Sequence, residues 1–80
     1  MHRLTTATHQ TLFRLAKRVR DDNDYYGVLS SSEKSVVALI LNRPDWIKEM
    51  GDTLGDAIHR VDNDRLLAVS VVERVLSEQA

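Results

Sequence analysis

The sequence contains no cysteine, so neither a disulfide bond nor a thiolate metal site can cross-link the chain. That absence is compatible with a reducing compartment, and we expect the protein to be cytoplasmic. One proline and three glycines leave few positions that interrupt regular backbone structure. No apolar run approaches the roughly 20 residues of a membrane span, and the N-terminal residues lack the apolar core of a secretory signal. These absences favour helices joined by short loops.

The residues that are present have the composition of an ordinary globular protein. Apolar residues make up 42% of the 80 positions and charged residues 29%. Every long segment repeats its apolar residues at a period near 3.6, and no segment alternates as a half-buried strand would. We therefore predict an all-α fold, a small bundle of four to five helices in a single domain spanning residues 1–80.

Residues 31–42 are the stretch around which this bundle is organised. Their apolar side chains face nearly every direction of a helix, which leaves no wide polar face. Ser30 and Glu33 form a Ser-x-x-Glu capping box at the start, and Pro44 is well placed to begin the next helix. A helix of this kind must be surrounded by other elements, so we predict a central helix over about 31–42.

The other predicted elements follow from apolar residues at helical spacing. They are a first helix over 3–20, a loop over 21–29, one or two helices over 44–61 and a last helix over 64–78. Gly27 is expected to allow a left-handed turn in the loop. Gly51 is followed by Asp52 and Thr53, which resembles the end of one helix and the cap of the next. We therefore predict a break or sharp kink at Gly51.

Charge is divided unequally along the chain. Residues 1–20 carry five basic side chains and no acidic one, whereas the remaining residues carry six basic and twelve acidic side chains. Phe13 lies off the apolar stripe of the first helix, among its cations, and an aromatic ring among cations is common at binding surfaces. We predict a partner-binding surface on this helix, formed by Phe13, Arg14, Lys17, Arg18 and Arg20. The alternative is that the basic helix complements the acidic rest of the fold and that the following loop covers Phe13.

The last helix is unusually apolar, because its apolar side chains cover most of its circumference. Such a helix either packs centrally beside residues 31–42 or meets a second copy of the chain. We expect the second arrangement, a homodimer contact through Leu67, Val71 and Val75.

The segment from Asp22 to Glu33 resembles the calcium loop of EF-hand proteins. Its ligand positions are occupied by Asp22, Asp24, Tyr26, Val28, Ser30 and Glu33. Tyr26 stands where a short side chain usually supplies an oxygen ligand. An acidic loop followed by a capping box would have a similar sequence pattern without binding calcium. We expect no calcium binding of sensor affinity.

A second resemblance is to the helix-turn-helix of small bacterial regulators. Residues 46–50 would form the scaffold helix and residues 54–61 the recognition helix, with Gly51 in the turn. The charge argues against this use, because acidic residues outnumber cations in the second segment and phosphate contacts need cations. A nucleic-acid partner would instead meet the basic first helix.

Catalysis has little support in the sequence. His2, His9 and His59 are scattered, and no phosphate loop, metal-ligand spacing or activated nucleophile is present. We expect neither an enzyme nor a cofactor. The leading hypothesis is a small non-catalytic helical binding protein, of the adaptor, inhibitor or accessory type, whose partner is another protein. A DNA-binding regulator is the alternative.

Overall fold

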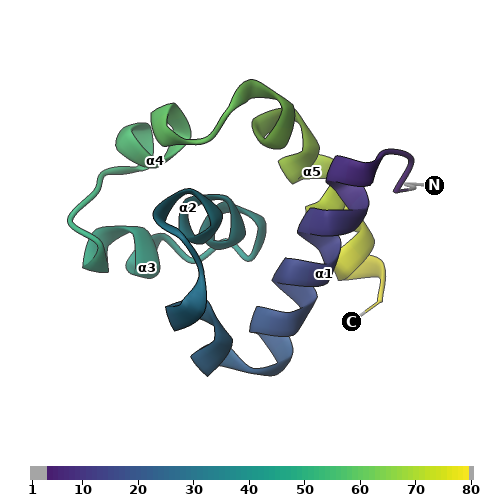
Figure 1. Cartoon of the computed structure of the whole chain (residues 1–80), viewed down its shortest axis with the longest axis horizontal. Coiled ribbons are helices and arrows are strands. Elements are labelled where there is room, and N and C mark those ends of the chain that lie inside the picture. Colours follow the sequence, from purple (N-terminus) through teal and green to yellow (C-terminus); the bar gives the residue numbers. More distant parts are fainter. Residues whose placement is uncertain (1–3, 80) are drawn as a thin grey trace.

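The computed structural model describes residues 4–79 and places most of them in helices (Figure 1). The elements are α1 (Ala7–Asp21), the 3-10 helix η1 (Asn23–Val28), α2 (Ser31–Ile40), α3 (Pro44–Glu49), α4 (Leu54–Arg60) and α5 (Asn63–Glu78). The predicted all-α bundle is confirmed. None of these helices is long and apolar enough to cross a membrane.

Helix α2 is the central helix of the bundle, as predicted. It contacts α1, α3, α4 and α5, and Figure 1 shows it nearly end-on in the middle of the others. Val36 and Val37 are fully buried, and so is Ser35, whose hydroxyl donates to the Ser31 carbonyl at 3.1 Å. The capping box also forms: the Ser30 amide donates to Glu33 Oε1 at 2.9 Å and the Glu33 amide donates to Ser30 Oγ at 3.2 Å.

The central helix ends two residues before the predicted boundary at 42. Asn42 adopts a left-handed backbone conformation with φ of 56°, which a helix cannot contain. Its amide donates to the Leu39 carbonyl at 3.2 Å, and the Arg43 amide donates to the Ala38 carbonyl at 2.8 Å. These two bonds form a Schellman motif, which satisfies the last carbonyls of α2 and redirects the chain into α3.

Helices α1 and α5 pack against each other and against α2. Thr6 caps α1, because its Oγ1 accepts a hydrogen bond from the His9 amide at 3.1 Å. Helix α1 therefore begins at Ala7, later than the predicted residue 3, which itself lies outside the described residues. The shared core contains buried side chains from all three helices, including Leu12, Ala16, Val19, Val36, Val37, Ala68 and Val72.

The predicted break at Gly51 is confirmed. Gly51 has a φ of +81°, a conformation that strains any residue with a Cβ. Thr53 then caps α4 through a second capping box, in which the Thr53 amide donates to Asp56 Oδ2 at 3.0 Å. Separating α3 from α4 lets Ile47 and Ala57 close on Ala38 in a second, smaller core cluster.

The predicted loop over 21–29 is wrong in part, because residues 23–28 form the 3-10 helix η1. Asp22 caps it, since its Oδ1 accepts a hydrogen bond from the Asp24 amide at 3.2 Å. Gly27 does not take the expected left-handed conformation. The segment is ordered by Tyr25 and Tyr26, which pack against the main core.

Candidate partner-binding surface

A shallow groove of about 260 Å³ lies where η1 meets the exposed flank of α1. We call it the α1–Tyr25 groove, and it is lined by Thr11, Arg14, Leu15, Arg18 and Tyr25. Four of these residues come from α1 at spacings of three and four, so they occupy one side of the helix. Tyr25 comes from η1, which folds back on α1.

Arg18 and Tyr25 contact each other in the groove. The Arg18 Cζ lies 4.4 Å from the centroid of the Tyr25 ring, within the range of a cation–π interaction. Stacking uses the face of the guanidinium and leaves N–H groups at its edge for a carboxylate or phosphate. Within residues 4–79, no acidic side chain forms an ion pair with Arg14, Lys17 or Arg18. The groove therefore presents unpaired positive charge beside an aromatic ring.

The basic residues predicted to form one binding surface on the first helix lie on two different parts of the surface. Arg14 and Arg18 share the groove, and Lys17 is exposed on the same helix. Arg20 is directed elsewhere: its Nη1 donates to the Leu76 carbonyl near the end of α5 at 3.4 Å, and its Nε lies 3.7 Å from Asp21. Arg20 therefore belongs to another part of the surface.

Phe13, which belongs to the predicted binding set, does not line the groove. Its side chain is half-buried and packs against the main core cluster, so the core stripe of α1 is wider than the predicted one. The aromatic side chain beside the arginines is instead Tyr25. The role of Tyr25 could not be predicted from the sequence, because its contact with Arg18 requires η1 to fold back on α1. The available signal was a pair of tyrosines directly after an acidic helix end.

The three residues predicted to form a homodimer contact differ in how exposed they are. Val75 is buried within the chain, Val71 is half-buried, and Leu67 is 68% exposed. Helix α5 packs against both α1 and α2, which accounts for most of its wide apolar arc. Only Leu67 of the three is exposed to a second copy, and the homodimer remains a prediction.

In the EF-hand-like segment, two of the predicted calcium-ligand side chains accept hydrogen bonds from the backbone. Glu33 accepts from the Ser30 amide, and Asp22 caps η1. The Tyr26 ring packs against Trp46 with centroids 4.5 Å apart and the ring planes tilted by 39°, and burial together with the charge of Glu49 raises the pKa of the Tyr26 hydroxyl. Across residues 4–79, no group of three metal-binding side chains is close enough to hold an ion.

The helix-turn-helix resemblance matches α3, the turn at Gly51 and α4 in order, but the charges of α4 do not suit DNA. Its cation Arg60 pairs with Asp52, with Arg60 Nη2 at 2.8 Å from Asp52 Oδ2. Asp56 is held ionised in the capping box, where hydrogen bonds from Thr53 lower its pKa. This helix therefore offers little positive charge to a phosphate backbone.

The histidines show no catalytic arrangement among the described residues. His9 lies beside Thr5 at the start of α1, with the Thr5 amide 3.3 Å from its Nδ1, and His59 is exposed on α4. His2 lies outside the described residues. Comparison of the chain with protein-family models, curated protein sequences and solved structures found no match.

Proposed function

We propose that this protein is a small non-catalytic binding protein whose α1–Tyr25 groove holds an acidic segment of a partner protein. The observation that carries the proposal is the pair of arginines, Arg14 and Arg18, that share one groove with Tyr25 and have no acidic partner among residues 4–79. Arginine and tyrosine are the residues most enriched at energetically important interface positions.

The choice of a protein rather than a nucleic acid rests on the size of the positive surface. Its cations span about one helical turn, from Arg14 to Arg18, and the acidic residues Asp21, Asp22 and Asp24 begin three positions later. A DNA duplex carries a negative charge about every 1.7 Å of its axis, so it would meet these acidic residues as well. A peptide can place a few carboxylates beside the arginines and apolar side chains against Leu15 and Tyr25.

The test compares the binding of three labelled probes by fluorescence anisotropy. The probes are a short peptide of glutamate and leucine, the same peptide with glutamine for glutamate, and a DNA duplex of similar length. We expect the acidic peptide to bind best. The double variant Arg14→Gln, Arg18→Gln should weaken this binding roughly tenfold or more, as loss of charge-assisted contacts does.

The matched control is the double variant Lys48→Gln, Arg74→Gln, which removes the same formal charge from exposed side chains of α3 and α5. It should bind the acidic peptide like wild type if the groove is the site. If both double variants weakened binding of the acidic peptide equally, binding would depend on the net charge of the protein and not on the groove, which would contradict the proposal. Tighter binding of the duplex, with affinity falling steeply as salt increases, would favour the DNA-binding alternative.

A further inference from the structure

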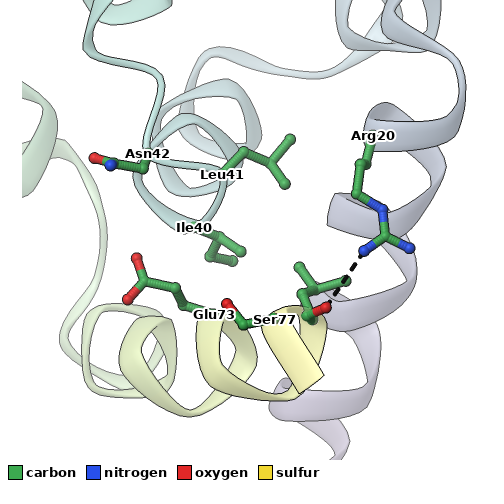
Figure 2. A pocket seen from close by; sticks show the side chains of 7 residues that line it. Arg20, Ile40, Leu41, Asn42, Glu73 and Ser77 are labelled. Carbon is green, nitrogen blue, oxygen red and sulfur yellow. Dashed lines mark hydrogen bonds between the residues drawn. The ribbon is translucent and has the colours of Figure 1, made fainter. Parts of the chain in front are cut away.

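A second, larger pocket lies on another side of α1, between the C-terminal parts of α1, α2 and α5 (Figure 2). Its volume of about 410 Å³ falls within the range of about 300–1,000 Å³ that is usual for small-molecule sites. Its apolar wall is formed by Ile40, Leu41 and Leu76. Ile40 and Leu76 belong to the buried core, so this wall is fixed by the packing of the fold.

The polar groups of this pocket carry opposite charges on opposite sides. Figure 2 shows Arg20 on the α1 side and Glu73 on the other side, with Ile40 and Leu41 between them. Arg20 and Glu73 are too far apart to form an ion pair, and within residues 4–79 no basic side chain pairs with Glu73. The Ser77 hydroxyl also lines the pocket.

The guanidinium of Arg20 is held in position by α5, but not all of its hydrogen-bond donors have a partner. Its one hydrogen bond within the described residues is the 3.4 Å bond to the Leu76 carbonyl, its Nε lies 3.7 Å from Asp21 Oδ1, and the Arg20 side chain is 35% exposed. A guanidinium has five N–H donors, so most of them remain for a ligand. A carboxylate is the group that matches this fork of donors best.

We infer that this pocket binds a small zwitterion of the amino-acid type. The carboxylate contacts Arg20, the ammonium contacts Glu73, and an apolar side chain lies on Ile40, Leu41 and Leu76. A ligand with only one charge would pair with one of these two groups and leave the other to water, and an entirely apolar ligand would pair with neither. This site is separate from the α1–Tyr25 groove and does not depend on the proposed function.

The test is an NMR titration of the isotope-labelled protein with leucine and two analogues. Leucinamide lacks the carboxylate, and N-acetylleucine lacks the ammonium. We expect leucine to shift the backbone amides of Ile40, Leu41, Leu76 and Ser77, and each analogue to bind roughly tenfold more weakly. No shift of these amides by leucine at about 10 mM, a concentration that detects even millimolar affinity, would overturn the inference.

Two variants identify which charge meets which group. Glu73→Gln should weaken leucine and leucinamide binding roughly tenfold and leave N-acetylleucine unchanged. Arg20→Gln should weaken leucine and N-acetylleucine binding and leave leucinamide unchanged. Glu78→Gln, on α5 outside the pocket, is the control and should change none of them. If Arg20→Gln disturbs the end of α5, Glu73→Gln alone decides, and an unchanged leucine affinity in that variant would contradict the site.

Discussion

Arg18 on α1 and Tyr25 on η1 hold each other in place across the end of the first helix, with the guanidinium carbon 4.4 Å from the ring centroid. The contact joins the two walls of the α1–Tyr25 groove, because one partner comes from each wall. Seven positions separate the two residues in sequence, yet the turn at Asp22 brings them face to face.

We expect this contact to be measurable in a double-mutant cycle. Arg18→Ala, Tyr25→Ala and the double variant should give a coupling of about 0.5–1 kcal/mol in the free energy of unfolding, the usual range for an exposed cation–π pair. Urea titrations followed by circular dichroism provide the measurement. Arg14→Ala combined with Tyr25→Ala is the comparison, and coupling as large in that pair would show that stacking by Arg18 is not special.

Replacing Gly51 and Gly27 by alanine should change the stability of the protein in opposite directions. Gly51→Ala should destabilise the protein by about 1 kcal/mol, because the φ of +81° suits only a residue without a Cβ. Gly27→Ala should leave stability unchanged or raise it by about 0.4–1 kcal/mol, because a Cβ there meets open space at ordinary φ. Thermal unfolding of both variants checks this, and equal losses would contradict the assigned backbone conformations.

The capping box of α4 predicts a dependence of stability on pH. Hydrogen bonds from Thr53 lower the pKa of Asp56 below its ordinary value of 3.8. Since the folded pKa is depressed, the contribution is present above the unfolded pKa and is lost as pH falls through the folded value.

Thr53→Ala should cost about 1 kcal/mol at neutral pH. Asp56→Ala should also destabilise at neutral pH, and its difference from wild type should shrink below about pH 3.8. Urea midpoints measured across this range provide the check. A difference that stays constant into strong acid would mean that the carboxylate is not the stabilising group.

Burial predicts a contrast between two leucines that the sequence makes look alike. Leu12→Ala should cost about 2–5 kcal/mol, because Leu12 is 2% exposed at the interface of α1 with the core. Leu67→Ala should change stability by no more than about 0.5 kcal/mol, because Leu67 is 68% exposed. Denaturation at low protein concentration makes the comparison for the isolated chain. A large loss at Leu67 that grows with protein concentration would instead indicate the predicted homodimer contact.

Some features of the site could be read from the sequence and others could not. The density of cations on the first helix and the proximity of Arg14 to Arg18 follow from helical spacing alone. The role of Tyr25 and the diversion of Arg20 to Leu76 did not follow, because both depend on contacts between separate elements. The partial burial of Phe13 did not follow for the same reason, because a helical wheel shows one helix and not the elements that pack around it.

The helical class, the capping box at Ser30, the central position of α2 and the break at Gly51 could all be predicted from the amino-acid order. These depend on local backbone preferences and on apolar periodicity, which a short segment carries whatever its neighbours are. The 3-10 helix at residues 23–28, the packing of α5 against both α1 and α2, and the pocket shared by Arg20 and Glu73 emerge only when the elements pack together. The physical reason is that side-chain burial and pairing depend on residues far apart in the chain, whose positions are fixed only when the helices pack together.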